Sequence, residues 1–401
     1  MNSKSYRQLF NIPGAITFCA AAFLGRLPAG MIGISVILPI SMLTGFYTTA
    51  GIVVAAIMSS MAVSAPLTGR LVDHYGQGKI LLIFAAINFI GTLTLIACIQ
   101  YDVILPLLCL AGVITGASRL STGTMVRTRW AYVIKKTFQP ERQAHMLQSA
   151  YAFESIIDEV VFICAPILAT VLCTTVHPLA GLACCLLTYT VGAVALAMQH
   201  RTEPTVEVIH SSSSALSISA LWVIFAAILF IGISAGALEV IVVARADHLG
   251  SRSFIGLLMA ILAGSSMMAG FWYGARNFNL SAYSLWIRCL GLLVCALIPF
   301  AFASNLVVLA IALFIAGLLI APTSISGQVL TQRLLPSNVL NEGMSLVVTG
   351  MILGMALGGW FSGVLIDKFD AYRAGALPAL AAFAAFVIAM LAAKQKSMHT
   401  A

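Results

Sequence analysis

Charged side chains are scarce in this sequence. Only 8% of the 401 residues are charged and 61% are hydrophobic, whereas soluble domains carry about 25% charged residues. Apolar runs of roughly twenty residues recur along the whole chain, and this is the length that a membrane-spanning helix needs. The runs lack the alternation of polar and apolar residues that a membrane β-barrel requires. The composition excludes a soluble domain and predicts an all-α, polytopic membrane protein.

Sequence patterns for catalysis and cofactor binding are also missing. The chain has no G-x-x-x-x-G-K-[ST] loop for ATP phosphates, no H-E-x-x-H helix and no clustered Cys/His set. Its nine cysteines lie within or beside apolar runs without a C-x-x-C pair, which is typical of small buried side chains. A membrane-embedded enzyme or lipid-handling protein would need a catalytic constellation that the sequence does not offer. We therefore expect a protein that is not an enzyme and that uses no cofactor or metal.

The apolar runs predict about twelve spans, and the charges between them predict an orientation. The spans fall at 12–40, 46–68, 79–99, 104–125, 147–172, 178–198, 217–243, 254–274, 281–303, 305–332, 343–366 and 374–393. With a cytoplasmic N-terminus, most basic residues outside the spans fall on the inner side, and only Arg245, Arg252, Lys368 and Arg373 fall on the outer side. This asymmetry follows the positive-inside rule and predicts that both termini are cytoplasmic. It also accounts for the net charge of +8 without a nucleic-acid partner.

A polar segment near the middle of the chain divides the spans into two sets of six. It contains a proline and a run of serines, which is typical of a flexible connection. We predict an N-terminal six-helix bundle at 1–198, a cytoplasmic linker at 199–216 and a C-terminal six-helix bundle at 217–401. The segments Thr48–Arg70 and Ser253–Arg276 look related. That likeness reflects either chance in a glycine-rich chain or the parallel repeats of a two-bundle transporter.

The turn between the second and third spans reads GRLVDHYGQGK. Gly69, Asp73 and Gly76 match in place the signature that the major facilitator superfamily carries at this turn, although the basic positions of the signature differ. The sequence resembles this family over essentially its full length. The resemblance implies a fold of two six-helix bundles, and a gate in which Asp73 pairs with Arg127 or Arg129. The alternative is an ordinary tight turn whose charges only set the topology.

Two further spans carry motifs that resemble those of the family. Arg119 and Gly123 match an Arg-x-x-x-Gly element of the fourth span, whose arginine the resemblance links to proton coupling; its alternative role is that of an ion-pair partner. In the fifth span, Ala165 and Pro166 stand where the exporter branch of the family has Gly-Pro. The surrounding stretch also looks like bacterial drug- and sugar-efflux permeases. The resemblance implies export and a place in the inner (cytoplasmic) membrane.

The fifth span begins with an unusual group of acids at membrane depth. Glu154 and Asp158 are four residues apart and share one helix face, whereas Glu159 lies about a hundred degrees round the helix. Each acid costs on the order of 2.5–3.5 kcal/mol in lipid, so we expect it to have a partner or a function there. The resemblance to the family implies that the first and fifth spans are neighbours, so we predict that Arg26 of the first span pairs with Asp158 or Glu159 and leaves Glu154 facing the cavity. With Arg26 and Arg119, these acids either carry a transported proton or lock the bundle.

Candidates for substrate contact come from four different spans. They are Arg26, Tyr151, Glu154, Glu239 and Gln328. Glu239 either lines the cavity or pairs with Arg245. Gln328 and the hydroxyl groups near it either bind substrate or hydrogen-bond neighbouring helices together.

These patterns predict a secondary transporter that works by alternating access. The favoured activity is proton-coupled export, by antiport, of a small organic molecule such as a drug, a sugar or a metabolite. The alternative is a proton-coupled symporter for uptake. Glu154 and Asp158 are the proton-site candidates. The expected partners are the substrate, protons and the lipid bilayer, and we expect the chain to be a monomer.

Overall fold

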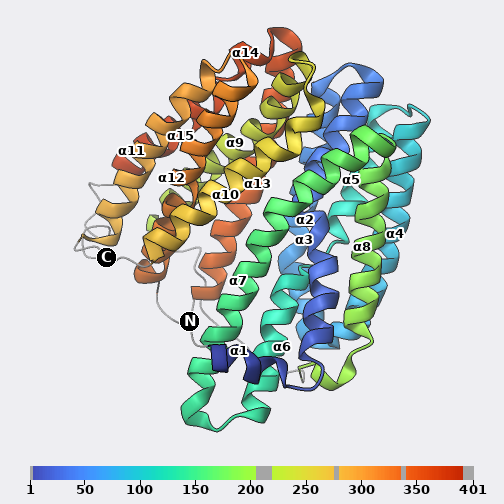
Figure 1. Ribbon diagram of the computed structural model, residues 1–401, viewed down its shortest axis with the longest axis vertical. Helices are drawn as coiled ribbons and strands as arrows, with labels where there is room; N and C mark the ends of the chain where they lie inside the picture. Colours follow the sequence, from blue (N-terminus) through green and yellow to red (C-terminus); the bar gives the residue numbers. More distant parts are fainter. Residues whose placement is uncertain (1–2, 205–218, 275–279, 336–339, 392–401) are drawn as a thin grey trace.

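The structure is a bundle of long α-helices (Figure 1). This computed structural model describes residues 3–204, 219–274, 280–335 and 340–391, and the side chain of Asp73 and those of a few other residues within these ranges lie outside the description. Twelve segments of the described ranges are helical, long and apolar enough to cross a membrane, and these ranges contain no β-strand. The predicted all-α fold with twelve spans is confirmed.

Six spans precede the undescribed residues 205–218 and six follow them. The first six are α2 (Ala15–Thr44), α3 (Tyr47–Tyr75), α4 (Gln77–Gln100), α5 with α6 (Leu105–Ala117 and Thr122–Thr137), α7 (Pro140–Val171) and α8 (Ala180–Ala197), and the short α1 (Ser3–Phe10) precedes them. The last six are α9 (Ser219–His248), α10 (Ile255–Gly274), α11 (Ala282–Ala301), α12 (Leu306–Leu334), α13 (Leu340–Lys368) and α15 (Leu377–Leu391), with α14 (Ala371–Ala374) before the last span. Helices suit this composition because a backbone in lipid must satisfy its own hydrogen bonds.

The fourth span differs from its prediction in length and in continuity. The sequence predicts one span at 104–125, whereas the structure has helix from Leu105 to Thr137 with a break between Ala117 and Thr122. The prediction ended early because Arg127 and Arg129 resemble loop charges, yet both lie within α6. They are tolerated there because acids and backbone carbonyl groups of neighbouring segments accept their hydrogen bonds.

Small residues bring neighbouring helices into direct backbone contact. In the first half, a Cβ atom placed on Gly192 of α8 would lie 2.6 Å from the Ala21 carbonyl oxygen of α2. In the second half, Cβ atoms on Gly236 and Gly358 would collide with backbone atoms across the contact between α9 and α13. Such close approach is the usual way in which membrane helices associate, because lipid tails give helices no hydrophobic drive to pack.

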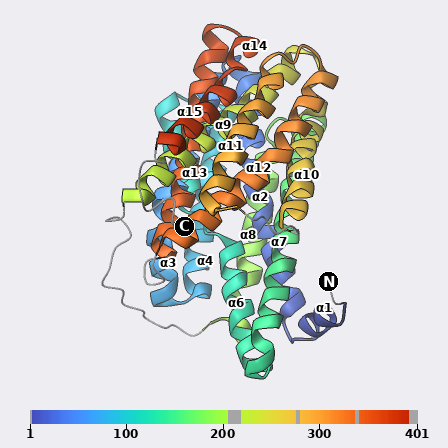
Figure 2. The same cartoon turned by 90° about the vertical axis from the view of Figure 1, so that its left-hand side faces the viewer.

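The two halves meet along two pairs of helices, α3 with α13 and α7 with α10. Figures 1 and 2 show α14 at one end of the bundle and α1 at the other; we call these the α14 end and the α1 end. A Cβ on Gly51 would lie 2.6 Å from the Gly359 carbonyl oxygen, and one on Gly256 would lie 2.6 Å from Ile167 Cα. Gly51 and Gly256 open the two related sequence segments, so they hold the same position at the two contacts between halves.

Residues 199–204 at the start of the predicted linker lie at the α1 end, against the turn between α3 and α4. The rest of that linker, residues 205–216, lies outside the described residues. The division at 1–198, 199–216 and 217–401 therefore stays a prediction.

Candidate functional site

Charged side chains from three spans meet inside the first half. Arg26 on α2 is 6% exposed. Its Nη2 donates to Glu154 Oε2 at 2.5 Å and its Nη1 donates to Asp158 Oδ1 at 3.2 Å. The two acids are one turn apart on α7, so one guanidinium group reaches both. Glu154 and Asp158 thus both pair with Arg26, and these ion pairs offset the cost of placing an arginine at membrane depth.

Glu154 is the most enclosed member of this cluster. It is buried, and besides the bond from Arg26 it accepts hydrogen bonds from Trp130 Nε1 at 2.7 Å and from Cys19 Sγ at 3.5 Å. The predicted pair of Arg26 with Asp158 is confirmed. The prediction that Glu154 stays unpaired and faces the cavity is wrong, because Arg26 pairs with Glu154 as well and the side chain of Trp130 covers it.

Arg127 completes the cluster from α6. Its Nη2 donates to Asp158 Oδ2 at 2.6 Å, so Asp158 bridges two guanidinium groups. Asp158 and Arg127 are the exposed side of the cluster, with side chains that are 32% and 34% exposed. When all four groups are ionised, the cluster has two positive and two negative charges. Glu159 does not join it: this residue is partly buried and makes no hydrogen bond or ion pair within the described part of the chain.

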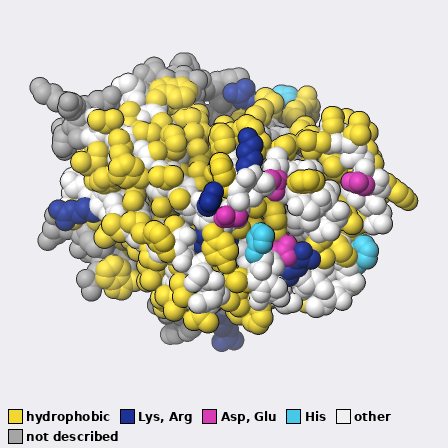
Figure 3. Space-filling view, turned by 90° about the horizontal axis from the view of Figure 1, so that it is seen from above, with side chains coloured by type: hydrophobic (Ala, Val, Ile, Leu, Met, Phe, Trp, Pro, Cys, Tyr) yellow, Lys and Arg dark blue, Asp and Glu magenta, His cyan; other side chains and the backbone are white. Residues whose placement is uncertain are grey.

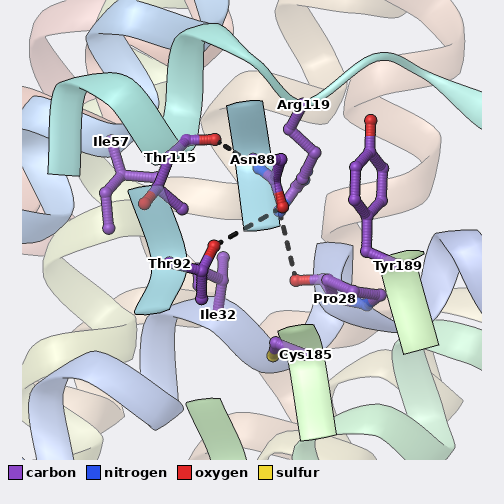
Figure 4. Close-up of a pocket in the computed structure, with 9 residues that line it drawn as sticks. All are labelled: Pro28, Ile32, Ile57, Asn88, Thr92, Thr115, Arg119, Cys185 and Tyr189. Carbon is purple, nitrogen blue, oxygen red and sulfur yellow. Dashed lines mark hydrogen bonds between the residues drawn. The ribbon is translucent and has the colours of Figure 1, made fainter. Parts of the chain in front are cut away.

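Arg119 lies in the break of the fourth span, apart from this cluster. Its Nη1 donates to the Pro28 carbonyl oxygen at 3.3 Å, and no carboxylate of the described residues pairs with it. It borders a cavity of about 10 Å³ beside Asn88, Thr115 and Tyr189 (Figure 4), which is at the lower limit for one water molecule. Carbonyl and aromatic groups, rather than an acid, therefore surround this arginine.

The residues of the predicted gate lie at the α1 end. Gly76 ends α3 with a φ of 90°, a conformation that favours glycine, whereas a Cβ on Gly69 would meet open space. The side chain of Asp73 lies outside the described residues, so its predicted pairing stays a prediction. Of its two candidate partners, Arg127 pairs with Asp158 and Arg129 bonds elsewhere.

Arg129 instead fastens the start of the linker to the first half. It is fully buried, and it donates to Gln77 Oε1 at 2.9 Å, to the Gln199 carbonyl oxygen at 3.1 Å and to Thr202 Oγ1 at 3.0 Å. Glu203 accepts the backbone N–H of Gly78 at 2.8 Å, at the first turn of α4. An acid at a helix N-terminus is stabilising, so this contact holds the turn in place.

The remaining substrate candidates are not gathered into one site. Tyr151 and Gln328 are exposed, and no hydrogen bond joins either to the cluster within the described ranges. Glu239 on α9 is partly buried against Gly33 of α2. Gly33 is seven residues after Arg26, so it lies on the same face of α2 about 10 Å further along the helix axis.

Glu239 does not pair with Arg245, which was one of its two predicted roles. Arg245 is buried and donates to the carbonyl oxygens of Ala371, Ala301 and Tyr372, each at 3.1 Å, and to that of Phe300. A cation at the C-terminal carbonyl groups of a helix is favourable, and Phe300 and Ala301 end α11. Arg245 therefore joins helix ends at the α14 end.

A second polar cluster, absent from the sequence predictions, joins the two halves at the α14 end. Asp367 at the end of α13 accepts the backbone N–H of Tyr47 at 3.0 Å and that of Thr48 at 2.7 Å. Tyr47 also donates its hydroxyl to Asp247 Oδ2 at 2.7 Å, and Asp247 pairs with Arg252. Acidic and basic side chains lie beside one another over this end, among hydrophobic ones (Figure 3).

The sequence carried one signal for this second cluster. An acid in the last turn of a helix opposes the helix dipole, so Asp367 is unfavourable within α13 alone. It becomes favourable because it binds the first N–H groups of α3, which no side chain of its own half caps. Nothing in the sequence indicates that the helix that Asp367 caps is α3.

The twelve candidate membrane spans and the charges buried among them are features of a polytopic membrane protein. A family model described as the Major Facilitator Superfamily matches residues 14–338. The chain belongs to this family, as the turn motif suggested.

Solved structures agree on the fold. A bacterial homologue of the human lysosomal transporter Spinster, in an inward-facing and occupied conformation, superimposes with a TM-score of 0.70 and 14% identity, covering 98% of each chain. A bacterial homologue of the iron transporter ferroportin, in an inward-facing state, gives 0.69 and 17% identity and covers 95% of this chain and 99% of its own. A D-xylose–proton symporter gives 0.62 and 14% identity, covering 92% and 96%. A search of curated protein sequences found no match.

Proposed function

We propose that this chain couples the movement of a small organic solute to that of protons, and that Asp158 is the carboxylate that exchanges the proton. The observation that carries this proposal is the position of Asp158. It is partly exposed within a membrane span, between the guanidinium groups of Arg26 and Arg127. Asp158 is therefore the more accessible of the two acids, whereas Glu154 is enclosed by Trp130 and Cys19.

Protonation of Asp158 would change the contacts between α2, α6 and α7. A neutral carboxyl group no longer neutralises two cations, so Arg127 loses its partner while Arg26 keeps Glu154. Glu154 thus acts as an anchor that holds Arg26 in place in both protonation states. The proton site and the anchor are one turn apart, which allows a proton to alter the packing of three spans.

The solute would pass by alternating access between the halves. The cross-half contacts of Asp367, Gly51 and Gly256 all lie at the α14 end, which supports a state closed at that end. The excess of basic residues at the opposite end supports a cytoplasmic position for the α1 end. The state is then inward-facing, like two of the similar structures. We propose that it occurs in the inner membrane with a single chain as the transporting unit.

Export by antiport is the first candidate for the direction. The fifth span carries the exporter-like Ala165–Pro166 at the closed end. A Cβ on Gly30 would lie 2.9 Å from Ala165 Cβ, and one on Gly256 would lie 2.8 Å from the Pro166 carbonyl oxygen. The motif thus sits where α7 meets both α2 and the opposite half. In this candidate a neutral or cationic solute competes with the proton for Asp158, and Glu239 and Gln328 contribute from the second half.

Uptake by symport is the second candidate, and a different observation favours it. Arg26 Nε is buried and has no hydrogen-bond partner in the described structure. When Asp158 is protonated, Arg26 keeps its positive charge and a free N–H donor at Nε. A solute that accepts this hydrogen bond would then bind together with the proton, as symport requires.

The function is tested in proteoliposomes with an imposed proton gradient and a panel of radiolabelled sugars, metabolites and drug-like cations. We expect at least one solute to accumulate in a gradient-dependent way, and Asp158→Asn to abolish that dependence. Asp102→Asn is the matched control, since Asp102 is an exposed acid outside the helices. Gradient-dependent accumulation that survives Asp158→Asn unchanged would refute the assignment of Asp158, and movement with or against the protons decides between the two directions.

A further inference from the structure

The break in the fourth span leaves a helix N-terminus inside the membrane. Residues 118–121 are not helical, and α6 begins at Thr122, near the middle of the span Leu105–Thr137. Ser121 caps α6 through its side chain, which accepts the N–H of Thr124. The backbone N–H groups of Ser121, Thr122 and Gly123 have no acceptor among the described residues. Free N–H groups at membrane depth require a partner from outside the helix.

A buried arginine is aimed at this same turn. Arg26 is 6% exposed, and its Nε has no hydrogen-bond partner. A Cβ placed on Gly123 would lie 3.2 Å from Arg26 Nε and 3.5 Å from Arg127 Nη1. Asp158 accepts from the other nitrogens of these two groups, Arg26 Nη1 and Arg127 Nη2. Arg26 Nε and Arg127 Nη1 therefore have no acid partner, and both lie beside Gly123, where α6 carries no side chain.

The exposed side of α6 is polar. Ser121, Thr124 and Thr128 are exposed along it, and Arg127 is partly exposed. These side chains bond within the protein: Thr124 donates to Ser121 Oγ, Thr128 donates to the Met125 carbonyl oxygen, and Arg127 donates to Asp158 Oδ2.

We propose that the first turn of α6, with Arg26 and Arg127, binds the carboxylate of an organic acid. The inference rests on the proposed function, because the arginines belong to the proton-exchanging cluster, and it names a substrate class for that function. Helix N-termini bind anions through free N–H groups and the helix dipole. Broken membrane helices present such ends to anionic substrates. A single negative charge fits, since neutralising Asp158 leaves the cluster with one unpaired cation.

Proton and carboxylate then favour each other's binding. A proton on Asp158 removes a negative charge next to the site and releases Arg127 to the solute. By linkage, the bound carboxylate favours protonation of Asp158 to the same extent. Such a solute travels with protons, so this substrate class belongs to the symport candidate.

The test is equilibrium binding to the purified full-length chain in detergent, followed by Trp fluorescence and by calorimetry. The probes are acetate, lactate and benzoate, each with its neutral amide as the matched ligand, at pH 5.5 and pH 7.5. We expect at least one acid to bind about tenfold or more tightly than its amide. We also expect Asp158→Asn, which removes the negative charge next to the site, to bind that acid more tightly than the unchanged protein does, whereas the affinity for the amide does not change. Equal binding of all acids and amides, or no binding of any acid, overturns the inference.

Variants connect the binding to this turn. Gly123→Ala places a methyl group against Arg26 Nε and favours helix formation, so it blocks the site without a loss of helix stability. We expect Gly123→Ala and Arg127→Gln each to weaken acid binding about tenfold or more. Arg288→Gln, at an exposed arginine of α11, is the control and leaves binding unchanged. Acid binding that survives both Gly123→Ala and Arg127→Gln contradicts the site.

This experiment is separate from the test of proton coupling. If Asp158→Asn abolishes gradient-dependent transport but no acid binds, the proposed function stands and only the substrate class falls. If acids bind at α6 but Asp158→Asn remains fully coupled, the anion site stands and the proton site lies elsewhere.

Discussion

Asp367 and Thr48 belong to opposite halves of the chain, yet a carboxylate oxygen of Asp367 accepts the backbone N–H of Thr48 at 2.7 Å. Its second oxygen accepts the N–H of Tyr47, so one acid caps the start of α3 with both oxygens. Opening of the α14 end separates α13 from α3 and leaves these N–H groups without this cap. The contact therefore favours the closed arrangement over an open one.

We predict that Asp367→Ala shifts the protein towards states that are open at the α14 end. A capping carboxylate contributes about 1 kcal/mol, so the open population should rise by a factor of about five. The readout is the rate at which a membrane-impermeant maleimide labels Ala356→Cys in a cysteine-free background, since Ala356 lies between α13 and α3 and is only 1% exposed. Asp370→Ala is the control, because Asp370 caps α14 of its own half. Equal labelling rates in both variants would contradict this role of Asp367.

The two acids of the charged cluster should differ in what they contribute to stability. Glu154 is buried with three hydrogen-bond donors, so Glu154→Gln should cost about 2–3 kcal/mol. Asp158 is one-third exposed and its ion pairs are partly screened, so Asp158→Asn should cost about 1 kcal/mol or less.

Thermal unfolding of the purified protein in detergent compares these variants. Trp130→Phe removes only one of the bonds to Glu154 and should fall between them. If Asp158→Asn proves more destabilising than Glu154→Gln, the division into a proton-exchanging group and an anchor is wrong.

The contact between α9 and α13 should not tolerate even one added methyl group. A Cβ on Gly358 would collide with the Ile233 carbonyl group, whereas a Cβ on Gly264 of α10 would meet nothing within 4 Å. We predict that Gly358→Ala lowers the unfolding temperature, because overpacking costs about 1–3 kcal/mol. Gly264→Ala should raise it slightly, because alanine favours the helix by about 0.5–1 kcal/mol. The same thermal assay serves both, and a neutral Gly358→Ala would show that the helices separate easily.

The sequence predicted the helices well and the contacts between them only in part. Apolar run length is a local property, so the twelve spans followed from it directly. The pairing of Arg26 with Asp158 or Glu159 was predicted because charges at membrane depth require partners and because the family resemblance makes the first and fifth spans neighbours; the structure shows Asp158 as the partner.

Other parts of the candidate sites depend on the three-dimensional arrangement. Glu154 was predicted to be free because Arg26 was assigned to one acid, whereas its guanidinium group reaches two. Its other partner, Trp130, is uncharged and could not be recognised as one from the sequence. The break at residues 118–121 was missed because the apolar stretches on either side were joined into one span, although Ser118, Arg119 and Ser121 interrupt them. The partners of Asp367 are backbone N–H groups, which any residue supplies, so no sequence pattern marks them.

The central claim, that Asp158 couples the solute to protons, is tested most directly by comparing exchange with driven transport in one preparation. Proteoliposomes containing Asp158→Asn are loaded with unlabelled solute to measure exchange without a gradient, and a proton gradient is then imposed to measure accumulation. We predict that exchange continues while gradient-driven accumulation is lost, because the halves still move but no longer respond to a proton. Accumulation at the wild-type level in Asp158→Asn would contradict the claim.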